Sequence, residues 1–446
     1  MTPAAASHRL TARMTNSSPR AQVPDPRLTL PIELLFVILE EAQYDDLIPR
    51  YKWIKNYTLV CIAWRNYAQQ LLYTSVALHK GTDQCKAFID ALAAARIRDV
   101  EHATVLGASV RFLSISIDHQ EIYADILDLC PNLRELHLVL YHASFRPEVL
   151  KRFAHAPPVR AMRVRTYHYM PLFQLLRAFA HLQFLEVDCS SVRDLTLELP
   201  PSPPPAWGLV ELRYHSLRRA THAFVNWALS GTARSTLEVL RVTCPSFDVT
   251  ELTSMGIAPN LRSIVLHHLW ERDDLTTFKS LRELALLFPS VPNHAPTFHT
   301  LPVGVRHLSL HAVGSRDTAQ AMVAAISAYQ ERSGDSLRVL TYHRRSESTS
   351  DLLLDAEALY TFCLERGIEF RLMDPPFGYY AGERIPLEPF DSYPQSVPLS
   401  TRRKKLDDGA LPWRVRREAS LTRRIVNAAG RAFGGTTVPS IALARP

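Results

Sequence analysis

Apolar residues recur through the middle of the chain in one arrangement, in which an apolar residue, two variable residues, an apolar residue, one variable residue and a third apolar residue follow one another. Ten segments match, and their starts lie 20 to 32 residues apart. The matching apolar triplets are Val110/Leu113/Ile115, Leu133/Leu136/Leu138, Val159/Met162/Val164, Leu182/Leu185/Val187, Leu209/Leu212/Tyr214, Leu237/Leu240/Val242, Leu261/Ile264/Leu266, Leu281/Leu284/Leu286, Val305/Leu308/Leu310 and Leu337/Leu340/Tyr342. The last two apolar positions lie two residues apart, so both side chains point to one face of a β-strand. One segment cannot cover that face alone, so we expect the strands to stack in one parallel sheet.

The segments between these predicted strands carry helical periodicity, with apolar residues three and four positions apart. Met322, Ile326 and Tyr329, for example, share one helical face. Helices are predicted over residues 121–130, 172–180, 220–230, 316–333 and 351–366. Gly334 and Gly367 stand where a glycine often ends a helix. Ahead of the first match, the triplet Tyr73/Val76/Leu78 predicts one additional strand that opens the sheet.

This arrangement resembles the leucine-rich repeat, in which each unit is a short strand followed by a return segment. The resemblance implies an α/β solenoid with a parallel sheet. The asparagine or cysteine that normally follows the strand in that family is absent here, because Cys189 and Cys244 fall one position early. The alternative is an α/β domain whose parallel strands only share a hydrophobic pattern.

A short block near the N-terminus predicts two amphipathic helices. The first follows Pro31, which is well tolerated in a first helical turn, and carries the apolar stripe Leu34, Leu35, Ile38 and Leu39. The second carries Leu59, Val60, Ala63, Trp64, Tyr67 and Leu71. Two such helices bury little surface alone, so they need each other, a third helix or a partner's groove.

The pair Leu30-Pro31, followed by Leu59-Val60-Cys61 and Trp64, resembles the F-box. That family is a three-helix module that docks its carrier onto the adaptor of a cullin ubiquitin ligase. Together with degenerate repeats, the block is similar to fungal F-box-like proteins. An ordinary three-helix segment at the start of a larger domain is the alternative.

The spacing inside the block departs from the family. Asp46-Leu47 resembles the usual start of the second F-box helix, but the distance to Trp64 is longer than usual by roughly two helical turns. Pro49 also interrupts this stretch. Residues 49–57 are therefore predicted to form a loop or an extra turn.

The resemblance implies a substrate-recognition subunit of an SCF-type cullin–RING ubiquitin ligase, a protein that is not itself an enzyme. The residues that it assigns to docking on a Skp-type adaptor are Leu30, Pro31, Leu34, Ile38, Leu39, Leu59, Val60 and Trp64. Some of these residues must instead hold the three helices together, and the pattern does not separate the two roles. The alternative function is a leucine-rich-repeat scaffold that binds partner proteins without a ligase.

Strand alternation also predicts which residues face a target. The variable residue between the last two apolar positions points to the other side of the sheet, which we expect to be exposed. These residues are His137, Arg163, Glu186, Arg213, Arg241, Val265, Ala285, Ser309 and Thr341. Because arginine forks bind carboxylates and phosphates, Arg163, Arg213 and Arg241 are candidates for binding an acidic or phosphorylated target segment. The alternative is a solvated face with Glu186, Glu211 and Glu238 as local ion-pair partners.

The positive charge lies mostly at the two ends of the chain. The formal charge is +7, of which residues 375–446 contribute +6 and residues 1–28 contribute +3, so the middle carries 7 − 6 − 3 = −2. A near-neutral body argues against a nucleic-acid-binding fold. The expected parts are a disordered leader, an F-box-like module, a leucine-rich-repeat-like solenoid and a disordered basic tail, over residues 1–28, 29–72, 73–374 and 375–446.

Motifs for chemistry are absent from the sequence. The six cysteines are widely spaced without a C-x-x-C pair, which argues against a zinc ribbon and is typical of buried thiols in a reducing compartment, so a cytoplasmic or nuclear location is expected. No phosphate-binding glycine loop, G-x-S-x-G or H-E-x-x-H occurs, and no apolar run is long enough to span a bilayer. His267-His268 lacks carboxylate or cysteine partners at metal-ligand spacing. We therefore expect no cofactor, no metal, no catalytic residue and no membrane or specific nucleic-acid partner.

Overall fold

The fold is that of a computed structural model of the 446-residue chain. The residues that it describes are 31–42, 44–45, 48–49, 51–98, 100–192, 205–216, 221–244, 247–269, 273–287, 298–311, 316–343 and 351–373. The predicted leader, the basic tail and the proline-rich segment 196–204 lie outside these residues.

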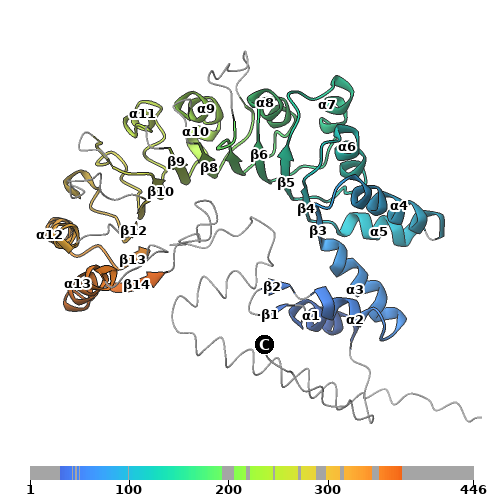
Figure 1. The fold of residues 1–446 in the computed structure, drawn as a ribbon, viewed down its shortest axis with the longest axis horizontal. Helices are drawn as coiled ribbons and strands as arrows, with labels where there is room; N and C mark the ends of the chain where they lie inside the picture. Colours follow the sequence, from blue (N-terminus) through green and yellow to red (C-terminus); the bar gives the residue numbers. More distant parts are fainter. Residues whose placement is uncertain are drawn as a thin grey trace, which may run out of the picture.

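One sheet of twelve parallel strands forms the body, and the strands follow one another in chain order from β3 to β14. The strands are β3 (Ser75–Leu78), β4 (Phe112–Ile115), β5 (Glu135–Leu140), β6 (Ala161–Thr166), β7 (Phe184–Asp188), β8 (Glu211–His215), β9 (Val239–Thr243), β10 (Ser263–Leu266), β11 (Glu283–Leu286), β12 (His307–His311), β13 (Val339–His343) and β14 (Glu369–Met373). Figure 1 shows that they form an arc whose concave side is lined by the strands. The body is therefore α/β with a parallel sheet, as predicted.

The strand register follows the repeat pattern. Leu113 of β4 lies opposite Leu136 of β5, and the equivalent apolar positions stay paired through all ten predicted strands. The opening strand is confirmed as β3, since Val76 lies opposite Leu113. The pattern did not predict β14. Its Phe370 lies opposite Leu340, which places Gly367 where the first apolar residue of the triplet would stand.

Helices return the chain along the outer side of the arc (Figure 1). They are α4 (Thr82–Arg98), α5 (Val100–Ser109), α6 (Gln120–Asp128), α7 (Pro147–Phe153), α8 (Tyr169–Ala178), α9 (Thr221–Ala228), α10 (Ala233–Thr236), α11 (Thr250–Ser254), α12 (Arg316–Ser333) and α13 (Asp351–Glu365), with a 3₁₀ turn, η2 (Phe298–Thr300). Each of the five predicted helical segments overlaps one of these helices; α12 has the predicted bounds, whereas α6 and α8 begin one and three residues before the predicted segments. Gly334 and Gly367 follow α12 and α13 with φ of 61° and 67°, in the left-handed region that glycine adopts most readily.

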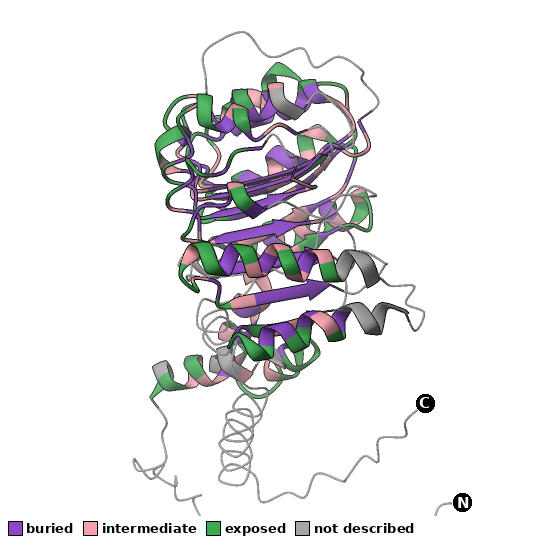
Figure 2. Ribbon diagram, turned by 90° about the vertical axis from the view of Figure 1, so that its left-hand side faces the viewer, coloured by how far each residue is buried: buried purple, intermediate pink, exposed green. Residues whose placement is uncertain are grey.

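The hydrophobic core lies between the strands and the outer helices. The inward-facing residues of β4 to β13, such as Leu136, Leu138 and Leu240, are at most 3% exposed and form one continuous cluster along the arc. Figure 2 shows the strands almost entirely buried and the helices exposed on their outer faces. Near β8 the core is aromatic, and the ring of Trp207 packs edge-on against Trp227. Stacking of units thus buries a surface that no unit could bury alone.

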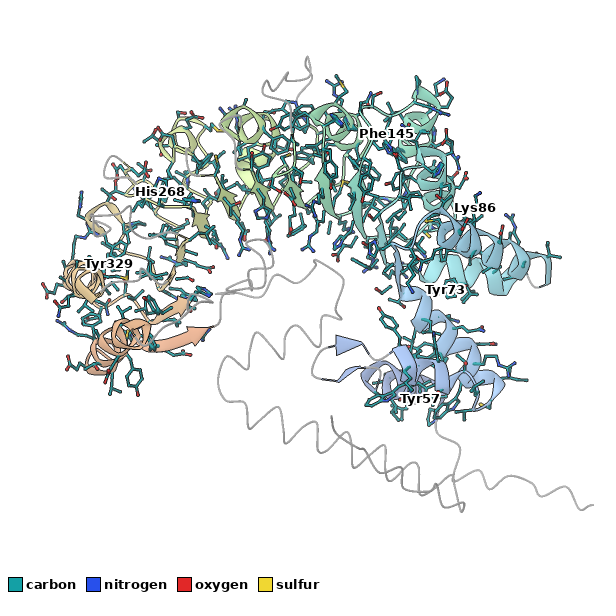
Figure 3. The ribbon with its side chains drawn as sticks, in the orientation of Figure 1. Tyr57, Tyr73, Lys86, Phe145, His268 and Tyr329 are labelled. Atoms are coloured by element: carbon teal, nitrogen blue, oxygen red, sulfur yellow. The ribbon has the colours of Figure 1, made fainter. Side chains whose placement is uncertain are left out.

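A small helical block precedes the arc, and Figure 3 shows it at the β3 end of the sheet, where Tyr57 is labelled. Its elements are α1 (Ile32–Ala42), the antiparallel pair β1 (Tyr44–Asp45) and β2 (Ile48–Pro49), α2 (Tyr51–Tyr57) and α3 (Ile62–Thr74). The side chains of Leu39, Ile54, Ala68 and Leu71 form a core separate from that of the arc. Helix α3 ends at Thr74 and leads directly into β3.

Two predictions for this block need correction. The second helix begins at Tyr51, after the β1–β2 pair, so most of the stretch predicted as a loop or extra turn is α2. Leu59 and Val60 precede α3 in a turn, because α3 begins only at Ile62. Asp46 and Leu47 lie outside the described residues. Among the helices that the structure describes, none combines the length and the apolar character that crossing a bilayer requires.

Candidate functional site

Large apolar side chains are exposed on the helical block. Leu34 is 51% exposed on α1, and Leu59 and Val60 are 79% and 58% exposed in the turn between α2 and α3. Val37, Tyr51, Trp53 and Ile62 are exposed as well. These seven account for nearly half of the fifteen large apolar residues that are exposed in the described part of the chain, although the block is only 44 residues long. Apolar surface concentrated in this way is typical of interaction sites.

The local folding of α1 divides its apolar stripe into two faces. Leu35 and Leu39, four residues apart, point into the core of the block. Leu34 and Val37, three residues apart, remain exposed. Since residues three and four apart share a helix face, α1 carries one apolar face for packing and a second one that the block leaves uncovered.

The turn before α3 holds its two apolar side chains in the solvent. Leu59 N donates to the carbonyl oxygen of Asn56 at 3.1 Å, and Val60 N donates to that of Tyr57 at 3.2 Å. The guanidinium of Arg65 also donates to the carbonyl oxygen of Thr58 at 3.2 Å. The exposure of Leu59 and Val60 is therefore a property of an ordered, hydrogen-bonded turn.

The residues predicted to dock on an adaptor thus separate into two groups. Pro31, Leu34, Leu59 and Val60 are exposed. Leu39 is 1% exposed, and Trp64 is half-buried with its ring edge-on to Tyr57 at 5.9 Å. Ile38 is half-buried, and Leu30 lies outside the described residues. Val37 and Ile62 are exposed as well but were not predicted to dock, although the helical spacing of Val37 from Leu34 was a detectable signal.

The second candidate site is the row of variable strand residues on the concave face. Sheet register places Arg163, Glu186, Arg213 and Arg241 side by side on β6, β7, β8 and β9, so the three predicted arginines are brought together. The predicted exposure of this row is wrong. Its buried members are Glu186, Arg213, Arg241, Val265, Ala285, Ser309 and Thr341, while His137 and Arg163 are half-buried.

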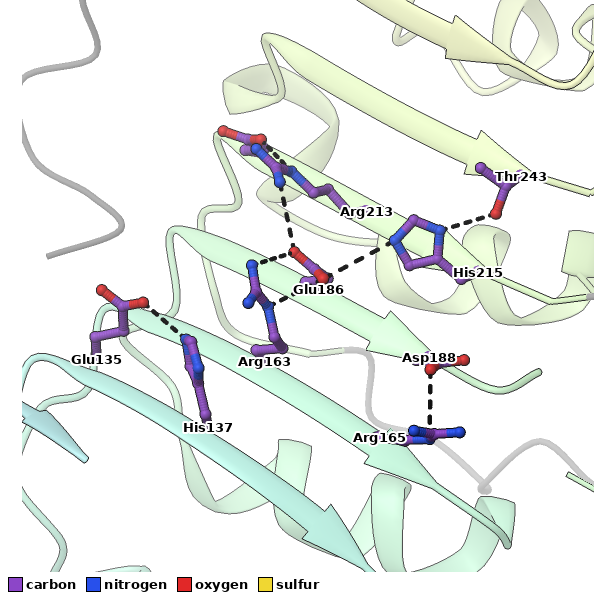
Figure 4. A network of polar contacts seen from close by, with 10 residues as sticks. Glu135, His137, Arg163, Arg165, Glu186, Asp188, Arg213, His215 and Thr243 are labelled. Atoms are coloured by element: carbon purple, nitrogen blue, oxygen red, sulfur yellow. Dashed lines mark hydrogen bonds and ion pairs between the residues drawn. The ribbon is translucent and has the colours of Figure 1, made fainter. Parts of the chain in front are cut away.

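Ion pairs within the row explain how charged side chains are buried there. Glu186 accepts from Nη2 of Arg163 at 3.0 Å and from Nη1 of Arg213 at 3.5 Å (Figure 4). Nε of Arg213 donates to Oε1 of Glu211 at 2.7 Å. The guanidinium of Arg213 also lies 5.1 Å from the centre of the Phe184 ring. Two of the predicted local partners, Glu186 and Glu211, therefore neutralise this row, whereas Glu238 lies 3.8 Å from Arg262 instead.

Burial and neighbouring charges shift the protonation equilibria in this network. Burial opposes the charged form of Arg213, but the carboxylates of Glu211 and Glu186 outweigh it and raise the pKa of Arg213. Burial and the positive charge of Arg213 lower the pKa of Arg241 to about 10. Burial, with the same arginines, lowers the pKa of His215 to about 2, so His215 is neutral and bonds Thr243 Oγ1 through Nδ1 at 2.8 Å.

Two further polar groups lie on the concave face. On β12 and β13, His307 bonds Thr341 at 2.8 Å and Ser309 bonds His343 at 3.0 Å. On β5, Glu135 bonds His137 at 2.7 Å. These contacts join side chains of the same or neighbouring strands, so they connect units of the sheet rather than forming a pocket.

The two adjacent histidines noted in the sequence, His267 and His268, directly follow β10. His267 and His268 bond each other at 2.9 Å, and burial lowers the pKa of His267 to about 4. Within the described ranges, no group of three or more His, Cys, Asp or Glu side chains is arranged to hold a metal ion. Comparison with known proteins found neither a matching family model nor a matching curated protein.

Proposed function

We propose that this chain is a substrate-recognition subunit of an SCF-type cullin–RING ubiquitin ligase. The helical block, as an F-box-like module, binds a Skp-type adaptor, and the leucine-rich-repeat-like arc binds the target protein. The single observation that carries this proposal is the exposed apolar surface of Leu34, Val37, Leu59, Val60 and Ile62 on a block with its own core.

The function requires no chemistry from the chain itself. One end holds the adaptor and the other holds the target, while the partner enzyme of the ligase supplies ubiquitin. Tethering raises the effective concentration of the target near that enzyme, so modest affinity for the target suffices. Such a subunit acts in the cytoplasm or the nucleus.

The proposal includes target binding by Arg163, Arg213 and Arg241. Their different burial decides which of them a target can reach. Arg163 has the most exposed side chain of the three, 42% accessible. Arg213 and Arg241 lie beside it in the same row but are buried. An acidic segment would therefore meet Arg163 first.

The alternative is a repeat scaffold without a ligase, in which the helical block only caps the first strand. A cap would direct its apolar side chains toward the sheet. The exposure of Leu34, Leu59 and Val60 favours the adaptor-binding function over this alternative.

Adaptor capture tests the proposal. The full chain should retain a purified Skp-type adaptor, and the triple variant Leu34→Ser, Leu59→Ser, Val60→Ser should weaken binding at least about tenfold. The matched control is Met170→Ser, Val303→Ser, Leu364→Ser, which removes three apolar side chains exposed on the arc. Failure of the wild type to bind any Skp-type adaptor, or equal binding by both triple variants, would refute adaptor docking.

A further inference from the structure

A row of arginines runs along the edge at which the strands begin. Backbone hydrogen bonds extend the ladder one residue ahead of each strand: Arg282 N donates to Arg262 O, Arg306 N to Arg282 O and Arg338 N to Arg306 O, each at 2.8 Å. Arg262, Arg282, Arg306 and Arg338 are therefore neighbours ahead of β10, β11, β12 and β13. We call these four residues the rim arginines.

One rim arginine has a structural role. Nη1 of Arg282 donates to the carbonyl oxygen of Gly304, two residues ahead of Arg306, at 3.2 Å. Arg111 makes the equivalent contact with Asn132, two residues ahead of Arg134, at 3.1 Å. An arginine at this position can thus link two units by a hydrogen bond from its guanidinium to the backbone of the next unit.

Two of the other rim arginines, Arg306 and Arg338, make no such contact among the described residues. Arg262 is half accessible and lies 3.8 Å from Glu238. Arg306 and Arg338 are exposed, and no carboxylate lies within 4.0 Å of either among the described residues. Two exposed arginine side chains therefore lie directly ahead of neighbouring strands.

Two carboxylates on the neighbouring elements β14 and α12 are engaged by other arginines. Glu369 on β14 pairs with Arg371 at 2.7 Å, and Glu331 on α12 lies 3.7 Å from Arg366. Neighbouring strands lie about 4.8 Å apart, so the rim arginines form a positive row about 15 Å long. The exposed side chain of Val303 adds apolar surface beside it.

We propose that the rim arginines bind an extended acidic peptide segment of a partner protein. Arginine forks hold carboxylates in bidentate geometry, and a row of them suits a chain with repeated Asp or Glu. Alternate side chains of an extended peptide lie about 6.7 Å apart, whereas neighbouring strands of the sheet lie about 4.8 Å apart. The arginine side chain is long and flexible enough to bridge this difference.

A peptide fits this row better than a single-stranded nucleic acid. Nucleic-acid strands require aromatic side chains on which bases stack. In the described residues directly ahead of β10 to β13, Phe278 and Phe298 are buried, and no Phe, Tyr or Trp is exposed. Arg306 and Arg338 are exposed and can be reached by an acidic segment. Arg213 and Arg241 of the concave row are buried.

This inference deepens the target-binding half of the proposed function and rests on it only in identifying the acidic partner as a ligase target. Peptide binding can be measured on the full chain without any adaptor. Loss of adaptor capture and loss of peptide binding are therefore separate results.

The test measures fluorescence anisotropy of a labelled peptide of alternating Glu and Ser residues with the full chain at low salt. The double variant Arg306→Glu, Arg338→Glu should weaken binding at least about tenfold. The matched control is Arg96→Glu, Arg234→Glu, which reverses two exposed arginines on the helices α4 and α10, away from the strand edge. The control should change binding less than about twofold.

Three results would overturn the inference. The first is undetectable binding of the peptide to the wild type. The second is an equal loss in both double variants, which would indicate unspecific attraction to positive charge. The third is tighter binding of a single-stranded oligonucleotide than of the peptide, which would assign the row to nucleic acid. Because all four substituted side chains are exposed, circular dichroism should show unchanged folding in both variants.

Discussion

The backbone of Gly107 in α5 lies against the carbonyl oxygen of Leu129, so closely that a Cβ built on Gly107 would overlap that oxygen. Leu129 follows α6, and its own N donates to the carbonyl oxygen of Ile126 at 3.1 Å. The oxygen therefore belongs to a hydrogen-bonded backbone and cannot move easily.

We expect Gly107→Ala to destabilise the chain by about 1–3 kcal/mol, the usual effect of overpacking. Alanine favours a helix over glycine by about 1 kcal/mol, so the clash must outweigh that gain. The control is Gly208→Ala, whose Cβ would meet only side-chain atoms of Thr236, at an ordinary contact distance of 3.7 Å. Urea unfolding should show a lower midpoint for the first variant and a change below about 1 kcal/mol for the second; an equal or higher midpoint for Gly107→Ala contradicts the prediction.

Removing the buried carboxylate of Glu186 should lower the free energy of unfolding more than removing an exposed carboxylate. Glu186→Gln removes the negative charge between Arg163 and Arg213, and breaking a buried pair from one side costs about 3–5 kcal/mol. Arg213 retains Glu211 and Arg163 is partly exposed, so we expect a loss near about 3 kcal/mol in denaturant unfolding. Glu238→Gln, at a half-exposed pair with Arg262, should change stability by less than about 1 kcal/mol. Equal effects of the two substitutions would argue against the network.

A buried histidine should make stability fall in mild acid. Burial lowers the pKa of His307 to about 3, with Arg371 and His343 contributing. The unfolded chain therefore binds more protons between about pH 6.5 and pH 3, and stability falls as the pH drops through that window. At pH 5 this histidine alone should account for about 2 kcal/mol of lost stability relative to pH 8.

The substitution His307→Gln isolates this contribution. It removes the titrating group and keeps a side chain that can bond Thr341. Unfolding free energies measured from pH 8 to pH 5 should fall less steeply in the variant than in the wild type. Parallel curves would show that His307 does not contribute to the pH dependence.

Substitutions of two leucines in α1 should have different effects on the stability of the helical block and on adaptor binding. Leu39 is buried in the core of the block, so Leu39→Ala should destabilise the block by about 2–5 kcal/mol. Leu34 is exposed, so Leu34→Ala should change stability by less than about 0.5 kcal/mol while weakening adaptor binding. Proteolysis of the N-terminal block reports its stability, and adaptor capture reports docking. A stable Leu39→Ala variant, or an unstable Leu34→Ala variant, contradicts this division.

Much of the arc was predictable from the apolar triplets, because an alternating apolar pattern places the same residues on the core face of every strand. Strand β14 was missed for a specific reason: Gly367, which ends α13, occupies the position of the first apolar residue. The helix α2 was missed because Pro49 and the unusual spacing obscured where the chain becomes helical.

For the candidate sites, the sequence identified the residues but not their accessibility. Arg163, Arg213 and Arg241 do lie in one row, since strand alternation fixes the side to which they point. Their burial depends on Glu186 and Glu211, which neighbouring strands bring within hydrogen-bond distance. In the same way, only the packing of α1 against α2 and α3 distinguishes the exposed Leu34 from the buried Leu39.

The sequence by itself determined the parallel stacking of the strands, their register and the helical return segments, because these follow from periodicities within each unit. Only the tertiary structure decided which apolar residues of the helical block stay uncovered and which arginines of the arc are solvated. Exposure depends on what distant segments place beside a side chain, and a pattern along one segment contains no information about those neighbours.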